Sequence, residues 1–501
     1  MENTFINILK ENTNFKYTEN FAVAHKSSLN AVYDMFSLGA AYRRRSEKDC
    51  ILLFKKAFEE DQTLALKCLF YLRDIRCGQG ERRYFRTCFK WLCKEYPEIA
   101  IRNLENVAEY GRYDDLFVAF DTPVQVNMID LIEKQLKLDL NSEVPSLLAK
   151  WLPSENTSSA ATVKLANRIR KSLKMSHKNY RKMLSKLRER IKIVERLMSE
   201  NRWNEIQFDK IPSKAGLIYR NAFARRDAER YAEFINSKKT KVNTKSLYPY
   251  EIVAQAINHS SLYNRNADLS DIERATLEKY WNNQKDYFNG QESKMICVCD
   301  TSGSMCEGRD AAAPINIAIS LSMYCAERNK GAFNNKYISF SSRPQFIEIE
   351  GVDFVDKVQR IYRTNLCENT NLEATFELLK NACLKSKPED RPETIVVISD
   401  MEIDSMTGDY WSGRGEGNWT KENALTNMEQ IRQEWAAVGL EIPRLVYWNV
   451  NARNDTVLDL GSKVSLVSGA SATLFESILS GKDGIEMMLE KLMSSRYEKV
   501  Q

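Results

Sequence analysis

Three oxygen-bearing side chains at regular spacing, Asp300, Ser302 and Ser304, are the residues in this sequence best suited to chemistry. They follow the short apolar run Met295–Cys299, which is typical of a strand buried on both faces of a parallel sheet. Such a strand would deliver Asp300 to the carboxyl edge of the sheet, with both serines in the next loop. One carboxylate and two hydroxyls are hard oxygen ligands, so the spacing predicts a site for Mg²⁺ or another divalent cation.

A complete site at this edge needs a second acidic strand end, and Asp400 supplies one. It follows the apolar run Thr394–Ser399, which predicts another buried strand of the same sheet. A further hydroxyl is expected from Thr370, in the loop before a predicted helix, with Thr364 and Thr375 as nearby rivals. The predicted metal ligands are therefore Asp300, Ser302, Ser304, Thr370 and Asp400.

A simpler interpretation of the serine motif remains open. Asp, Ser and Gly are common turn formers, so the segment 300–304 could be a turn without a ligand. Two further acidic residues, Glu402 and Asp404, follow the second strand closely. We expect them to be solvated loop charges, and the alternative is that they support the metal ligands from behind.

The elements that would position these ligands belong to an α/β region that begins near residue 293. Short apolar runs alternate there with helical stretches, which is the pattern of a doubly wound sheet. The sequence predicts strands at 295–300, 336–342, 394–400, 444–450 and 463–469, and helices at 314–328, 372–384 and 422–438. We expect an α/β domain over residues 291–501.

Residues 1–290 show a different pattern, with helical periodicity and little β-branched alternation. Serial helices of this length favour an all-α, HEAT-like helical-repeat solenoid or ring, although no fixed repeat period is visible. With 501 residues the chain is too long for a single core, so we expect a multidomain protein.

Positive charge is concentrated within this helical region. Residues 164–245 hold 24 Lys and Arg against 8 Asp and Glu, in a chain whose total is only +5. A basic face on a rigid helix suits phosphate recognition, and its affinity would fall steeply with salt. The candidate RNA-binding residues are Lys171, Lys174, Lys178, Arg181, Lys182, Lys186, Arg188, Arg225 and Arg226.

One long helix is expected to carry most of these cations. Apolar residues recur at helical spacing from Tyr180 to Leu197 and predict one buried stripe, with the basic residues on the remaining face. Tyr180, Trp203 and Tyr219 are interleaved aromatics that could stack on bases. The alternative is an ordinary solvated face, with some cations paired to acidic residues elsewhere in the chain.

The arrangement of the predicted metal ligands resembles the metal-ion-dependent adhesion site of von Willebrand A domains. In that family a D-x-S-x-S motif is followed by a Thr from a later loop and an Asp at a later strand end. Asp300, Ser302, Ser304, Thr370 and Asp400 match this order. The resemblance covers about residues 293–495, and it implies Mg²⁺ with one open position for an acidic group of a partner protein.

The helical region resembles the TROVE module of Ro ribonucleoproteins. The resemblance rests on the arginine-rich segment around Gly78–Gly80, "RDIRCGQGERR", and on "GRYDDL" at 111–116. Ro proteins also carry a C-terminal von Willebrand A domain after a ring of helical repeats. The stretch 176–223 is most similar to a Ro-like family of largely uncharacterised proteins in plants and large viruses. The resemblance implies binding of small non-coding or single-stranded RNA.

These observations predict a Ro-like RNA-binding scaffold that holds RNA in its basic helical domain and docks a partner at the metal site. The alternative is a metal-dependent protein-interaction module that does not bind RNA. No nucleophile–base pair is recognisable, so we do not expect an enzyme. Eleven cysteines without paired C-x-x-C spacing, and no apolar run of roughly 18 residues, favour a cytoplasmic monomer with no membrane association.

Overall fold

The computed structural model describes residues 13–18, 22–191, 193–257, 267–308, 310–340, 343–363, 371–403 and 426–501. The chain forms two compact units. The first, called here the sheet unit, combines Met1–Ala65 with Leu247–Leu492. The second, called the helical unit, combines Leu66–Ser246 with Met493–Gln501. The predicted boundary at residue 290 is the point where the chain changes from helices to strands. The two packing units have different boundaries, after residues 65, 246 and 492.

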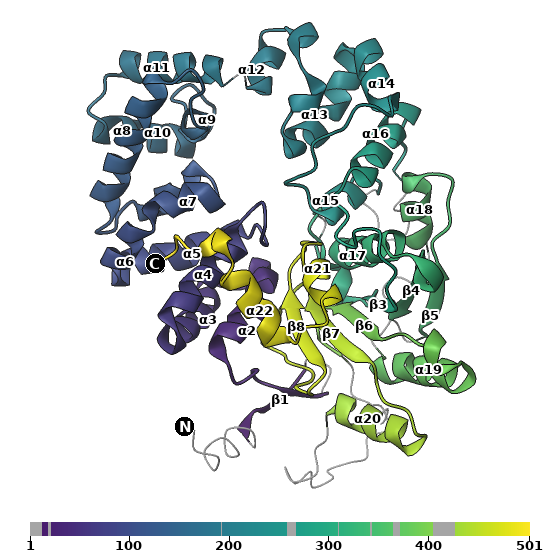
Figure 1. Cartoon of the computed structure of the whole chain (residues 1–501). Helices are drawn as coiled ribbons and strands as arrows, with labels where there is room; N and C mark the ends of the chain where they lie inside the picture. Colours follow the sequence, from purple (N-terminus) through teal and green to yellow (C-terminus); the bar gives the residue numbers. More distant parts are fainter. Residues whose placement is uncertain are drawn as a thin grey trace. The chain divides into compact units, whose positions relative to one another are not determined.

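A six-stranded mixed sheet forms the centre of the sheet unit, with the strand order β5-β4-β3-β6-β7-β8 (Figure 1). All neighbouring strands run parallel except β5, which pairs antiparallel with β4 at one edge. The strands are β3 Met295–Asp300, β4 Lys336–Phe340, β5 Gln345–Glu348, β6 Thr394–Ser399, β7 Arg444–Asn449 and β8 Val464–Ser468.

The two central strands explain why this sheet forms. Every residue of β3 is buried, and so are all residues of β6 after Thr394. Burial on both faces is what parallel strands require, because helices cover both sides of such a sheet. The longest of these helices, α17 (Pro314–Arg328), packs against β3, β4 and β6 and begins with a proline at its first turn.

The strand and helix prediction for this region is confirmed at β3, β4, β6, β7 and β8 and at α17. The helix predicted at 372–384 is α19. The antiparallel edge strand β5 was missed. The remaining helices of the sheet unit after residue 246 are α15 Pro249–Val253, α16 Asp271–Asn282, α18 Phe354–Ile361, α19 Leu372–Lys385, α20 Asn427–Ala437, α21 Leu474–Leu479 and α22 Gly484–Leu492.

The N-terminal residues pack onto the other edge of the sheet. They form β1 (Phe15–Tyr17), β2 (Val23–His25), α2 (Ala31–Leu38) and α3 (Glu47–Glu60). Helix α2 packs on β8, where the buried Tyr33 hydroxyl accepts a hydrogen bond from Leu466 N at 2.6 Å. The first helices of the chain therefore complete the sheet unit rather than the helical unit.

The helical unit contains helices and short 3₁₀ turns throughout its described residues, which confirms a mostly helical N-terminal region. A HEAT-like repeat stays a prediction. The elements are α4 Gln62–Arg73, α5 Arg82–Glu95, α6 Pro97–Arg102, α7 Leu104–Tyr110, η2 Tyr113–Ala119, α8 Gln125–Asn141, α9 Leu148–Trp151, α10 Ala160–Ser172, α11 His177–Arg190, α12 Val194–Ser199, η3 Trp203–Glu205, η4 Phe208–Lys210, α13 Ser213–Arg226, α14 Ala228–Asn236 and η9 Ser495–Tyr497.

The arginines around Gly78–Gly80 hold the helical unit together. Arg73 and Asp115 form a buried ion pair, with Nη2 and Oδ2 separated by 2.7 Å. Arg86 Nε binds the other oxygen of Asp115 at 2.6 Å. The C-terminal residues join the same network, because Arg496 Nε donates to Asp74 Oδ2 at 2.8 Å. These contacts place the arginines in the packing of the unit.

The long helix predicted from Tyr180 to Leu197 is wrong in its extent. Helix α11 ends at Arg190, and a separate helix, α12, begins at Val194. The predicted stripe is buried within α11 at Tyr180, Met183, Leu184 and Leu187, and in α12 at Val194, whereas Ile191 and Leu197 are only half-buried. In the described part of the chain, no helix has both the length and the apolar character needed to cross a membrane.

Candidate functional site

The two strands that carry the predicted acidic ligands are neighbours at the centre of the sheet. The chain leaves β3 toward β4 on one side and leaves β6 toward β7 on the other. In open α/β sheets such a reversal of strand order marks the place where ligands bind, at the carboxyl ends of the two strands, and this place is called here the crevice. Asp300 is the last residue of β3, and Asp400 directly follows β6. The fold therefore brings both carboxylates to this crevice.

The loop after β3 arranges its oxygens around Asp300. Asp300 is fully buried, and its Oδ1 accepts a hydrogen bond from Ser302 N at 2.9 Å. Its Oδ2 accepts one from Ser399 Oγ at 2.5 Å, which ties β3 to β6. The hydroxyls of Ser302 and Ser304 lie 3.0 Å apart. Three of the predicted ligands therefore form one group of oxygens at the start of this loop.

Asp400 is the less satisfied of the two carboxylates. Its Oδ1 accepts a hydrogen bond from Glu402 N at 3.3 Å. Its Oδ2 is buried without a hydrogen-bond donor and lies 3.4 Å from Arg453 Nε. Burial and the neighbouring Asp300 carboxylate raise the pKa of Asp400 well above its usual range. A buried oxygen that lacks a donor, beside a second carboxylate, is an arrangement that a cation would stabilise.

Sequence reasoning missed two residues of this crevice, Ser399 and Arg453, and assigned a third, Glu402, to solvent. Ser399 binds Asp300, and Arg453, in the polar loop after β7, forms the ion pair with Asp400. Glu402 was expected to be solvated, and this expectation is wrong because the side chain is fully buried. It accepts hydrogen bonds from Asn454 and Thr456, each at 3.2 Å. The polar run after the β7 strand was the signal that could have identified Arg453.

A further hydroxyl ligand was predicted from the loop before α19. Thr370, its rival Thr364 and the acidic residue Asp404 lie outside the described residues. Thr375 is described and buried, and its Oγ1 donates to Asn371 O at 3.1 Å within α19. Thr375 is therefore engaged with its own helix.

The donor set fits a hard cation better than a transition metal. No cluster of three or more His, Cys, Asp or Glu side chains suited to a metal occurs among the described residues. Asp300 and Asp400 offer two carboxylates, and the serines add hydroxyls. Mg²⁺ is commonly bound through one or two carboxylates while it keeps several waters, so this set suits it.

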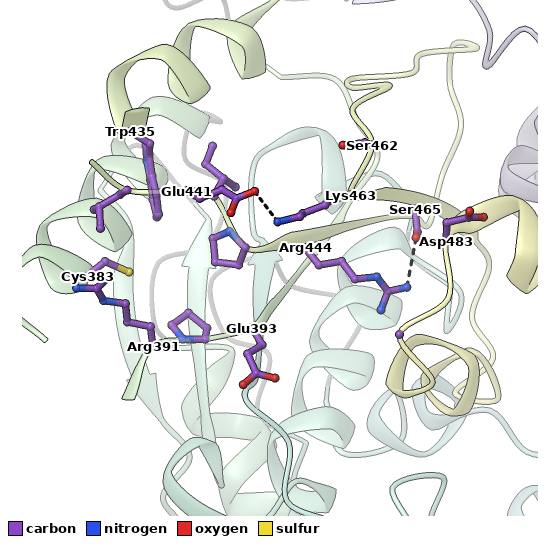
Figure 2. Close-up of a pocket in the computed structure, with 15 residues that line it drawn as sticks. Cys383, Arg391, Glu393, Trp435, Glu441, Arg444, Ser462, Lys463, Ser465 and Asp483 are labelled. Atoms are coloured by element: carbon purple, nitrogen blue, oxygen red, sulfur yellow. Dashed lines mark hydrogen bonds and ion pairs between the residues drawn. The ribbon is translucent and has the colours of Figure 1, made fainter. Parts of the chain in front are cut away.

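A cavity of about 440 Å³ opens at the opposite edge of the sheet, beside the amino ends of β6, β7 and β8 (Figure 2). Two of its cations are engaged within the unit. Lys463 Nζ pairs with Glu441 Oε1 at 2.5 Å, and Arg444 donates to Ile478 O at 2.6 Å and to Ser465 Oγ at 3.3 Å. A third cation of the lining, Arg391, has a buried Nε without a hydrogen-bond partner.

The predicted RNA-binding cations lie on α10, α11 and the end of α13, with Lys174 in the loop between α10 and α11, all within the helical unit. Eight of the nine side chains are exposed. Arg181 lies 3.9 Å from Glu155, at the limit of an ion pair. The other seven have no ion-pair partner among the described residues: Lys171, Lys174, Lys178, Lys182, Lys186, Arg225 and Arg226.

Two residues of the predicted RNA surface have structural roles instead. Arg188 is half-buried and donates to Ala149 O, Leu152 O and Ser154 Oγ at 2.7 to 2.8 Å. These bonds hold the segment after α9 against α11, so Arg188 is removed from the exposed surface. Tyr180 is fully buried, with its hydroxyl on Pro153 O at 2.9 Å, and cannot stack on a base.

Two known proteins are similar to this chain over most of its length. It is 29% identical to "Uncharacterized protein L728" of Acanthamoeba polyphaga mimivirus, over 94% of this chain and 85% of that protein. The crystal structure of the Deinococcus radiodurans Ro (RSR) protein superposes with a TM-score of 0.46 and 13% identity, covering 93% of this chain and 99% of that one.

Two family models together cover most of the sequence. The model described as "Domain of unknown function (DUF7788)" matches residues 294–500, which include the whole six-stranded sheet. The model described as "Domain of unknown function (DUF2828)" matches residues 18–116 and 135–297. Because this second model matches more than half of the chain, the protein belongs to the DUF2828 family.

Proposed function

We propose that this protein is a Ro-like RNA-binding scaffold, in which the helical unit binds small non-coding or single-stranded RNA. The observation that carries the proposal is the set of seven exposed cations without ion-pair partners among the described residues. Lysines and arginines that are already neutralised by neighbours contribute little to phosphate binding. These seven would release the counterions of the RNA backbone when they bind it.

The helices that present these cations support the proposal. Helix α11 is capped by Ser176, whose hydroxyl accepts a hydrogen bond from Asn179 N, and the apolar face of the helix is buried. Lys178, Lys182 and Lys186 follow one another at intervals of four residues, so they form a single row on the exposed face. Charges on a rigid helix lose less conformational entropy when RNA binds than charges on a loop would lose.

We further propose that the sheet unit contains a von Willebrand A-type domain with a divalent cation in its crevice. The strand order, the antiparallel edge strand and the position of Asp300 support this assignment. Asp300, Ser302, Ser304 and Asp400 would hold Mg²⁺, together with Thr370. When bound, the metal would supply a positive centre with an exchangeable position, to which an acidic side chain of a partner protein could bind.

The two parts of this proposal are tested separately. RNA binding is measured by fluorescence anisotropy with a labelled single-stranded RNA at increasing salt, and we expect affinity to fall steeply. Cation binding is measured by calorimetry with Mg²⁺ and Mn²⁺, with Asp300→Ala as the control that removes a ligand. RNA binding that does not change with salt would refute the phosphate-binding role, and equal cation binding by Asp300→Ala would refute the metal site.

A second function is favoured by the unsatisfied oxygen of Asp400. On this alternative the protein is a metal-dependent interaction module that binds an acidic partner and no RNA. The distinguishing result is a protein complex that depends on Asp300 while RNA affinity is absent. For both functions, the RNA-binding scaffold and the interaction module, we propose a cytoplasmic monomer without catalytic activity.

A further inference from the structure

The helical unit contains a cavity of about 620 Å³ that lies beside the basic surface but is separate from it. Its walls come from α5, η2, α9, α10 and α11 and from the loop that follows α9. A volume of several hundred Å³ is typical of a pocket for a small organic ligand. The side chains in its wall therefore decide which class of ligand it suits.

Cations dominate the charged part of this wall. Arg86, Lys150 and Arg188 line the cavity, whereas Asp114 is the one carboxylate in the described lining. Lys150 Nζ lies 3.7 Å from Glu195 Oε1, at the outer range of an ion pair, and Arg188 donates to uncharged acceptors, so its charge is not neutralised by them. Arg86 donates to Asp115 through Nε and to Asp114 through Nη2, so only part of its set of N–H donors is used by these bonds. A guanidinium carries five N–H groups, so Arg86 and Arg188 each retain donors after their internal bonds are made. Such anchored guanidiniums suit a phosphate group.

The remaining wall is aromatic, apolar and weakly polar. Trp151 lines the cavity, and the guanidinium of Arg112 lies 3.9 Å from the centroid of its ring. Arg112 is itself fixed by two hydrogen bonds to Asp114, at 2.6 and 2.8 Å. The indole is therefore held by a rigid neighbour. Phe117 adds a second ring to the wall, and Thr162 is one of several hydroxyl and amide groups around it.

Cations for a phosphate, rings for a base and hydroxyls for a sugar occur together in this one cavity. We propose that it binds a single phosphorylated nucleotide, with the base against Trp151 and the phosphate near Lys150 and Arg86. Base–aromatic stacking and ionic contacts are the terms that bind nucleotides without reading their sequence.

This inference extends the proposed RNA-binding function and rests on it for the chemical class of the ligand. The residues that form the cavity are different from those of the exposed row on α11. The exposed row on α11 would bind backbone phosphates along a strand. The cavity would hold one nucleotide, which is either free or the end of an RNA chain. Variants in one site therefore leave the other intact, and the two proposals can fail independently.

The test is calorimetric titration of the full-length protein with adenosine 5′-monophosphate, compared with adenosine and with inorganic phosphate. We expect the nucleotide to bind more tightly than about 1 mM and more tightly than either part alone. Lys150→Gln and Trp151→Leu should each weaken binding at least about tenfold. Trp151→Tyr, which keeps an aromatic ring, should retain more affinity than Trp151→Leu, and Lys164→Gln, an exposed lysine on α10 outside the cavity, should bind like the wild type.

The source of the nucleotide is distinguished by competition. A short RNA with a 5′-phosphate that displaces the mononucleotide identifies an RNA end as the ligand, and failure to displace identifies the free nucleotide. The proposal is overturned if the wild type does not bind the mononucleotide at about 1 mM. It is also overturned if Trp151→Leu and Lys150→Gln, checked for folding by circular dichroism, bind as tightly as the wild type.

Discussion

The row of lysines on α11 allows a quantitative prediction for RNA binding. Lys178, Lys182 and Lys186 lie four residues apart, so consecutive lysines are separated by about 6 Å along the helix axis. Changing all three to glutamine removes up to three phosphate contacts and leaves the buried face of α11 unchanged. For single-stranded nucleic acid each contact contributes about −0.7 to the slope of log affinity against log salt, so the slope should fall by about 2. This corresponds to roughly 50-fold weaker binding at about 0.15 M salt and several hundred-fold at about 0.05 M.

The assay is fluorescence anisotropy with one labelled single-stranded RNA over a series of salt concentrations. A matched control changes three exposed lysines of the sheet unit, Lys48, Lys385 and Lys387, to glutamine. It removes the same net charge from the other unit and should change the slope little. If the α11 variant keeps the wild-type slope, or if both variants lose affinity equally, the row on α11 is not the RNA surface.

The remaining predictions concern the crevice and the stability of each unit. Asp400→Asn should abolish Mg²⁺ binding, measured by calorimetry. Arg453→Gln removes the positive charge 3.4 Å from Asp400 and should tighten Mg²⁺ binding about tenfold or more. If both variants bind Mg²⁺ with the affinity of the wild type, the assigned ligands are wrong. Asp115→Asn breaks the buried pair with Arg73 and should lower the free energy of unfolding by about 3–5 kcal/mol in urea titrations, and a loss below about 1 kcal/mol would show that the pair is dispensable. Burial raises the pKa of Asp34 to about 6, so its ionisation destabilises the fold as the pH rises from about 4 through 6. Asp34→Asn should therefore match the wild type near pH 4 and be more stable near pH 8 by on the order of 3 kcal/mol, and a pH-independent difference between the two would contradict this reasoning.

Those parts of the crevice that are formed by the ends of buried strands could be predicted from the sequence. A short apolar run that ends in Asp identifies both the strand and the position of its carboxylate, which is why Asp300 and Asp400 could be paired from the amino-acid sequence alone. Arg453 could not be paired in the same way. Its position depends on β7 lying next to β6, and this order of strands is a property of the whole sheet.

Contacts between a helix and a segment that is distant in the sequence also could not be predicted from helical periodicity. Nothing in the local pattern of α2 indicates that Tyr33 will lie against β8, more than 400 residues later. Exposure of the basic residues was predicted well, because lysines on the polar face of an amphipathic helix remain in solvent. Arg188 is the exception, because its guanidinium donates hydrogen bonds to carbonyl oxygens at the end of α9. The periodicity of α11 does not predict a contact with another helix.

The central claim, that the helical unit binds RNA, is tested most directly by the nucleic acid that accompanies the purified full-length protein. The measurement is the 260/280 nm absorbance ratio after purification at low salt, followed by sequencing of any bound RNA. The account predicts a ratio above that of the protein alone, with RNA that is released as the salt concentration rises. A ratio equal to that of the protein alone, together with no binding of added single-stranded RNA at about 0.05 M salt, would contradict it.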